Sequence, residues 1–131
     1  MLSLLIYFFS IVYGDTQYSP LDCSGLREGT FKTMATSEDG TAFTTIIKRK
    51  KNVQYEEVPE FNVKAVFKVE WVSDCAYNLV NPKVIKGKLP ALKPDLKLYV
   101  KITGIEEDGY TVDITSNGYT GIKTFKLYNY K

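Results

Sequence analysis

Two pairs of adjacent carboxylates come closest to a catalytic arrangement in this sequence: Glu56-Glu57 and Glu106-Glu107. Adjacent residues of a strand point to opposite faces, so neither pair can converge on one substrate. Asp108 adds a third oxygen ligand beside the second pair, which is too few for a calcium site. The chain has no histidine, the commonest general base and the commonest metal ligand. We therefore expect solvated carboxylates, no enzyme activity, and no metal or cofactor.

The densest charge feature is the basic run Lys48-Arg49-Lys50-Lys51. Such a run could face anionic lipid or an acidic partner. We favour a solvated hairpin tip, where lysines also discourage edge-to-edge pairing of strands. The formal net charge is only +2, whereas a nucleic-acid-binding face concentrates far more positive charge. We expect no nucleic-acid partner.

The first segment has the pattern of a secretory signal. Residues 2–13 are apolar and uncharged, and they are too few to span a bilayer, which takes about 20 helical residues. Small or β-branched residues precede a cleavage point near Gly14-Asp15. We predict a signal peptide over 1–14 and one domain over 15–131 that does not itself span a membrane. The alternative is a buried N-terminal strand or helix.

Two cysteines, Cys23 and Cys75, are present. An even cysteine count in an exported chain favours a disulfide. The pair would close a loop of roughly fifty residues, which the chain-entropy model converts to about 4 kcal/mol of stabilisation. We predict this disulfide, and with it a periplasmic, outer-membrane-associated or extracellular location.

Alternation of apolar and polar residues organises the rest of the chain. Residues 63–71 and 96–102 place apolar side chains on one face and lysines on the other, which is typical of antiparallel strands with one wet face. Asp108-Gly109 and Asn117-Gly118 are favoured hairpin turns. Eight strands are predicted: 29–36, 41–49, 53–58, 63–72, 75–85, 96–105, 110–116 and 119–128. We predict an all-β fold, a small up-and-down, lipocalin-like antiparallel barrel; a two-sheet β-sandwich is the alternative.

Aromatic side chains supply the remaining candidate sites. Trp71 is the only tryptophan and shares an apolar face with Phe67. With Tyr77, these residues either fill the core or line a ligand cavity, because an eight-stranded barrel can do both. Tyrosine is enriched at protein interfaces, and the candidates here are Tyr99, Tyr119, Tyr128 and Tyr130.

Three short motifs resemble those of a group of small exported proteins of Bacteroidetes, chiefly flavobacteria, whose members often carry the name DNA topoisomerase IV. The motifs are Asp22-Cys23-Ser24-x-Leu26-Arg27-x-Gly29-x-Phe31, Arg49 followed by Gln54-x-Glu56, and Trp71-x-x-Asp74-Cys75-x-Tyr77-x-Leu79. The resemblance implies an exported bacterial protein with paired cysteines and brings no known activity. The chain is far too short for a topoisomerase. Ala76 stands where the relatives often have an acidic residue.

Two functional hypotheses remain. The small size, the ten tyrosines and the missing catalytic groups predict a non-catalytic protein-binding module, an accessory subunit of a bacterial envelope complex. The alternative is a lipocalin-like carrier of a small hydrophobic ligand, which follows from the predicted barrel.

Overall fold

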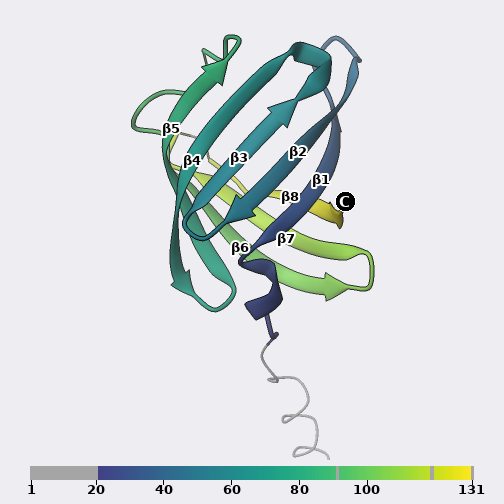
Figure 1. Cartoon of the computed structure of the whole chain (residues 1–131), viewed down its shortest axis with the longest axis vertical. Helices are drawn as coiled ribbons and strands as arrows, with labels where there is room; N and C mark the ends of the chain where they lie inside the picture. Colours follow the sequence, from purple (N-terminus) through teal and green to yellow (C-terminus); the bar gives the residue numbers. More distant parts are fainter. Residues whose placement is uncertain (1–20, 91, 119, 131) are drawn as a thin grey trace, which may run out of the picture.

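Eight antiparallel strands form one closed barrel (Figure 1). The structure is a computed structural model that describes residues 21–90, 92–118 and 120–130. The predicted all-β, up-and-down barrel is confirmed. The predicted signal peptide over 1–14 lies outside the described residues.

Each strand pairs with the next in the chain, and the last pairs with the first. The strands are β1 Gly29–Thr36, β2 Ala42–Lys50, β3 Val53–Val58, β4 Val63–Ser73, β5 Ala76–Lys86, β6 Leu98–Glu106, β7 Gly109–Ser116 and β8 Lys123–Asn129. Two short 3₁₀ helices are described, η1 Ser24–Leu26 and η2 Pro59–Phe61. Most strand ends fall within two residues of prediction, but β8 begins at Lys123 rather than at residue 119.

The inward faces are the apolar faces that the alternation predicts. In β4, Val63, Ala65, Phe67 and Val69 are buried while Lys64 and Lys68 are exposed. Burial of large apolar side chains is the main stabilising contribution in such a fold. The buried core is completed by residues of the other strands, among them Phe31, Ile47, Tyr77, Leu79, Val100, Ile102, Tyr110, Val112 and Leu127.

Gly109 allows the barrel to close tightly beside β8. A Cβ atom at this position would lie 2.0 Å from the carbonyl oxygen of Leu127 and 2.9 Å from the Cα of Tyr128. Real carbon and oxygen atoms do not approach so closely, so only glycine fits where β7 starts against β8. The β1–β8 seam itself is short, with Phe31 opposite Asn129 and Lys32 opposite Tyr128.

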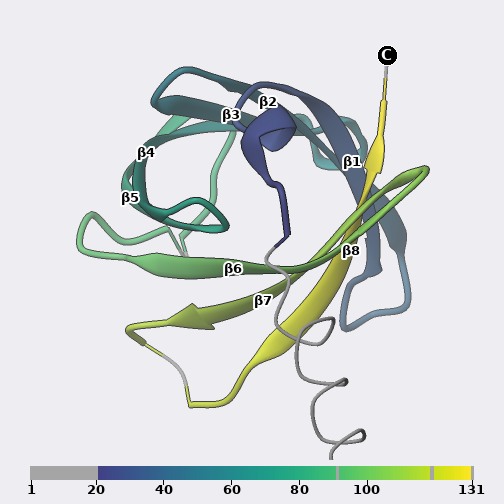
Figure 2. The same cartoon turned by 90° about the horizontal axis from the view of Figure 1, so that it is seen from below.

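The two ends of the barrel differ. At the lower end in Figure 1, η1 lies against the ring of strands, and the same end is seen from below in Figure 2. The Cys23–Cys75 disulfide ties the residue before η1 to the residue before β5, with a Cα–Cα distance of 5.4 Å. The predicted disulfide is thereby confirmed, and it is compatible with an oxidising, exported location. Within the described part of the chain, no helix is long and apolar enough to cross a membrane.

Candidate functional site

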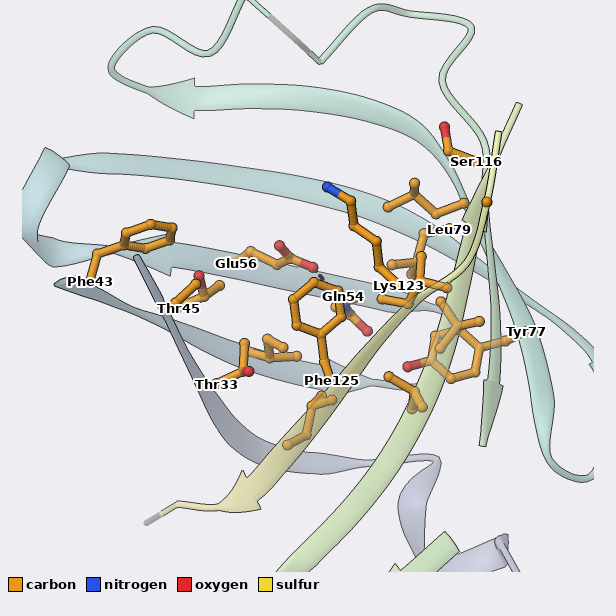
Figure 3. Close-up of a pocket in the computed structure, with 18 of the residues that line it drawn as sticks. Thr33, Phe43, Thr45, Gln54, Glu56, Tyr77, Leu79, Ser116, Lys123 and Phe125 are labelled. Carbon is orange, nitrogen blue, oxygen red and sulfur yellow. Dashed lines mark hydrogen bonds between the residues drawn. The ribbon is translucent and has the colours of Figure 1, made fainter. Parts of the chain in front are cut away.

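The barrel interior contains a cavity of about 410 Å³ that is partly open to solvent. Inward side chains from β1, β2, β3, β5, β6, β7 and β8 line it (Figure 3). Most of these are apolar, and they include Phe43, Ile47, Leu79, Leu98, Val100, Val112, Ile114, Phe125 and Leu127. The residues Thr120, Gly121 and Lys123 at the β7–β8 connection place the cavity toward the end opposite η1. This size and apolar character suit a small organic ligand.

Arg49 lies at the lower end of the barrel interior with only 2% of its surface exposed. Its guanidinium donates four hydrogen bonds: to Gln54 Oε1 at 2.8 Å, Leu26 O at 2.6 Å, Tyr77 Oη at 2.8 Å and Tyr110 Oη at 2.9 Å. All four acceptors are neutral. The bond to Leu26 also fastens η1 to the barrel interior.

Aromatic rings surround the same guanidinium. Its central carbon lies 4.7 Å from the ring centroid of Tyr77 and 5.2 Å from that of Phe31. Cations bind favourably to aromatic faces, more so away from water. Gly29 is opposite Arg49 in the β1–β2 register, and a Cβ there would lie 2.9 Å from Phe31 Cζ. The missing side chain at Gly29 thus leaves room for the Phe31 ring.

Glu56 is the acidic residue in the cavity lining. Gln54 Nε2 donates to Glu56 Oε2 at 2.7 Å, while the oxygen of the same amide accepts from Arg49. Gln54 and Glu56 are two residues apart on β3, so both project inward (Figure 3). The result is a polar chain, Arg49–Gln54–Glu56, that rises from the lower end into the cavity.

Burial shifts the pKa of two ionisable groups in and beside the polar chain, Glu56 and Tyr77. Removal from water raises the pKa of Glu56, while the bond from Gln54 and the charge of Arg49 act in the opposite direction. Burial also raises the pKa of Tyr77 well above its usual value, with nearby Tyr110 contributing in the same direction. The Tyr77 hydroxyl therefore remains protonated and neutral at physiological pH.

The structure overturns two expectations about charge. Arg49 was expected in a solvated hairpin tip, but it is buried, and only the three lysines of the run, Lys48, Lys50 and Lys51, are exposed. The carboxylates Glu56 and Glu57 were both expected in water, but Glu56 faces the cavity, whereas Glu57 pairs with Lys64 on the outside at 3.9 Å. Alternation explains both errors, because each strand continues its inward face through a charged residue.

Sequence reasoning from residue types missed Arg49, Gln54 and Glu56 as interior residues. The spacing of residues along β2 does indicate that Arg49 faces inward. Arg49 is two residues after the apolar Ile47, and a strict period of two places both on one face. Gln54 is directly opposite Arg49 in the β2–β3 register, which becomes visible only when the hairpin is aligned about residues 51–52.

The predicted aromatic candidates separate into different places. Phe67 is buried in the core and Tyr77 lines the cavity. Trp71 is outside the set of residues that line the cavity. Its ring lies 4.7 Å from that of Tyr77 and 4.3 Å from the guanidinium carbon of Arg27. Trp71 thus packs beside Tyr77, near the lower end of the barrel where η1 lies, which we call the closed end.

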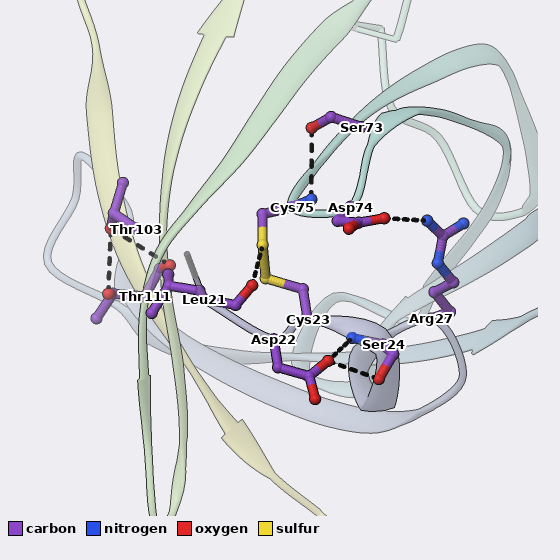
Figure 4. The surroundings of a disulfide bond; sticks show 10 residues. All are labelled: Leu21, Asp22, Cys23, Ser24, Arg27, Ser73, Asp74, Cys75, Thr103 and Thr111. Atoms are coloured by element: carbon purple, nitrogen blue, oxygen red, sulfur yellow. Dashed lines mark hydrogen bonds and ion pairs between the residues drawn. A yellow bond between two sulfur atoms is a disulfide. The ribbon is translucent and has the colours of Figure 1, made fainter. Parts of the chain in front are cut away.

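The closed end joins segments that are far apart in the sequence (Figure 4). Besides the disulfide, Arg27 forms a 3.8 Å ion pair with Asp74, and Asp22 accepts bonds from the backbone and hydroxyl of Ser24. The three motifs that carry the resemblance therefore meet here, since the first supplies η1, the second Arg49, and the third Asp74 and Tyr77.

The predicted interface tyrosines that the structure describes belong to different segments of the chain. Tyr99 on β6 is 40% exposed and Tyr130 after β8 is 39% exposed. Tyr128 is half-buried, with Lys126 over its ring. Tyr119 lies outside the described residues.

The acidic turn between β6 and β7 has a cationic partner. Lys126 Nζ lies 2.6 Å from Glu106 Oε1 and 2.9 Å from Asp108 Oδ1. These two carboxylates raise the pKa of Lys126. Over the ranges that the structure describes, no cluster of acidic, histidine or cysteine residues could hold a metal ion.

Comparison of the chain with protein-family models, curated proteins and solved structures finds no match. What the site can bind is therefore inferred from its geometry alone. The cavity combines apolar walls, a carboxylate whose Oε1 has no hydrogen-bond partner among the described residues, and a neutral hydroxyl. That arrangement can bind and orient a small molecule.

Proposed function

We propose that this protein binds a small, mostly apolar molecule inside the barrel, as lipocalin-like carriers do. The observation that supports this proposal is the cavity of about 410 Å³ with predominantly apolar walls. Ligand sites of proteins are typically preformed, apolar and supplied with a few polar groups that fix orientation. Gln54, Glu56 and Tyr77 supply such groups here.

The anchoring of the closed end supports a preformed site. The Cys23–Cys75 disulfide and the Arg49–Leu26 hydrogen bond hold η1 in place from two sides. A cavity that is already shaped binds without a large ordering cost. The disulfide and the predicted signal peptide fit an exported carrier, in the periplasm, at the outer membrane or outside the cell.

Fluorescence of N-phenyl-1-naphthylamine, which rises in apolar surroundings, tests the proposal. The probe is titrated into the oxidised wild-type protein and two tryptophan variants. Thr33 lines the cavity and its neighbour Met34 is 56% exposed on the outer face. We expect Thr33→Trp to fill the cavity and weaken probe binding at least about tenfold, and Met34→Trp to bind as wild type does.

Either of two results would overturn the proposal that the protein carries a ligand. One is the absence of any fluorescence increase with wild-type protein. The other is equal binding by Thr33→Trp and Met34→Trp, because the probe would then lie outside the barrel. Circular dichroism of both variants establishes that each retains the β-barrel.

A second candidate is a protein-binding module, an accessory subunit of an envelope complex. A second, smaller pocket favours it, lined by Tyr55 and Ile85, whose side chains are 49% and 53% exposed, and by Lys48, Glu57 and Lys64. Exposed tyrosine is enriched at protein interfaces, although lysine and glutamate are depleted there. Native mass spectrometry of the protein extracted gently from its own envelope separates the candidates. A complex with other polypeptides supports the subunit, and a mass increase of small-molecule size supports the carrier.

A further inference from the structure

The cavity is mostly apolar, and its one acidic lining residue, Glu56, faces the space that a ligand would occupy. Glu56 Oε2 accepts from Gln54 at 2.7 Å, and no protein donor to Glu56 Oε1 is found among the described residues. No fully buried side-chain oxygen or nitrogen there lacks a partner, so Oε1 has accessible surface. Glu56 lines the cavity and also borders the smaller pocket beside Tyr55, and its carboxylate points toward the other residues that line the cavity (Figure 3).

Arg49, the cation of the polar chain, does not face the cavity and so cannot contact a ligand there. Four hydrogen bonds of Arg49 already go to protein acceptors, and Arg49 is absent from the residues that line the cavity. A ligand therefore meets the negative end of the Arg49–Gln54–Glu56 chain and not its positive end.

We infer that the ligand carries a hydrogen-bond donor, a hydroxyl or an amine, which binds Glu56 Oε1, and that ligands with an ionised carboxylate at this end are rejected. This inference rests on the proposed function and adds the chemical class of the ligand. A hydroxyl or amine completes the unfilled hydrogen-bonding capacity of the carboxylate. A second carboxylate instead repels it in surroundings of low dielectric constant.

Lys123 is the competing feature of the same cavity. It projects from β8 into the lining near the β7–β8 connection, where it could attract a carboxylate at the mouth. A ligand bound in that orientation would direct its tail toward Glu56. The apolar tail would then cover the carboxylate without a hydrogen bond, which is unfavourable.

Three probes with the same chain and different head groups test the inference: 1-decanol, decylamine and decanoate. Each displaces N-phenyl-1-naphthylamine from the wild-type protein at pH 8, below its micelle-forming concentration. We expect 1-decanol and decylamine to bind at least about tenfold more tightly than decanoate.

Two variants identify the residue responsible. Glu56→Gln removes the charge and keeps the size, so we expect decanoate to approach 1-decanol to within about threefold. Glu57→Gln makes the same change one residue away on the outer face, where Glu57 pairs with Lys64, and it should leave the wild-type ratio intact.

The outcomes separate this inference from the proposed function. If no probe binds and the naphthylamine fluorescence does not rise, both fail. Equal displacement by all three probes, or a wild-type ratio in Glu56→Gln, overturns only the head-group assignment. Preferred binding of decanoate that is lost in Lys123→Gln also overturns it, because the head group would then lie at the mouth.

Discussion

Arg49 and Glu56 are joined inside the barrel by a single side chain, the amide of Gln54. Arg49 Nε donates to Gln54 Oε1 at 2.8 Å, and Gln54 Nε2 donates to Glu56 Oε2 at 2.7 Å. The positive charge is therefore compensated by the carboxylate through an amide and not by direct contact. Buried charges are costly when uncompensated, so the stability of the two residues should be coupled.

Replacement of Arg49 should expose this coupling. Arg49→Met leaves Tyr77, Tyr110 and Gln54 without their shared donor and Glu56 without its counter-charge. We expect a loss of about 3–5 kcal/mol in the free energy of unfolding, the range for removing one member of a buried charged pair. Urea denaturation followed by circular dichroism measures it.

A double variant and a surface control complete the test of coupling. In Arg49→Met/Glu56→Gln the uncompensated carboxylate is gone, and we expect at least about 1 kcal/mol to be recovered relative to additivity. Lys50→Met, at an exposed neighbour, should stay within about 0.5 kcal/mol of wild type. Strict additivity of the two interior changes would contradict the coupling.

Glu56 should also make stability depend on pH. Because its pKa is raised in the folded protein above the ordinary 4.5, the folded state binds this proton more tightly than the unfolded state. The contribution of Glu56 to stability therefore increases as pH falls from above the raised pKa to about 4.5. Wild type should therefore gain stability relative to Glu56→Gln as the pH falls from 8 to about 4.5.

Chemical denaturation at several pH values measures the free energy of unfolding of wild type and Glu56→Gln. Glu57→Gln is the control. Glu57 forms an exposed pair with Lys64, so its replacement should not reproduce the pH-dependent difference. A constant difference between wild type and Glu56→Gln from pH 8 to pH 4.5 would show that burial does not perturb this carboxyl group.

The fold could be predicted because its determinants are local. Period-two alternation in residues 63–71 marks one buried face, and the turn at Asp108-Gly109 specifies a hairpin without any knowledge of distant residues. The disulfide followed from the even number of cysteines. The alternation and the turn can be read from a single sequence because each depends on neighbours along the chain, whereas the disulfide joins distant residues and could be predicted because only two cysteines are present.

The cavity could not be predicted because it depends on distant residues together. Whether this barrel interior is filled is decided jointly by side chains from seven strands, and the register between strands is not contained in the sequence of any one strand. The polar chain was missed for another reason. Arg49 and Glu56 were interpreted by charge, which favours solvent, although their spacing from Ile47 and Gln54 favours the inward face.

Gly109 provides a test of close approach in the barrel wall. Gly109→Ala would place a methyl group 2.0 Å from Leu127 O, so β7 and β8 must separate locally. We expect a loss of about 3 kcal/mol or more in the free energy of unfolding, at the upper end for steric overpacking. At Gly25 a Cβ atom meets nothing within 4 Å, and Gly25→Ala should be nearly neutral. Equal effects would argue against the tight β7–β8 contact.

The Cys23–Cys75 disulfide should stabilise the closed end more than the barrel wall. The two cysteines are separated by 52 positions, for which loop-closure entropy gives roughly 4 kcal/mol. We expect Cys23→Ala/Cys75→Ala to lose about that free energy of unfolding in urea.

Hydrogen exchange then localises the effect of this change. In the double variant, η1 keeps the Arg49–Leu26 hydrogen bond and the adjacent Arg27–Asp74 ion pair but loses its covalent link, so amides of residues 23–27 should exchange faster than those of β7. Reductant should destabilise the wild-type protein and leave the double variant unchanged. Uniform acceleration across all strands would instead mean that the lower end and the wall unfold as one unit, with the disulfide acting on global stability only.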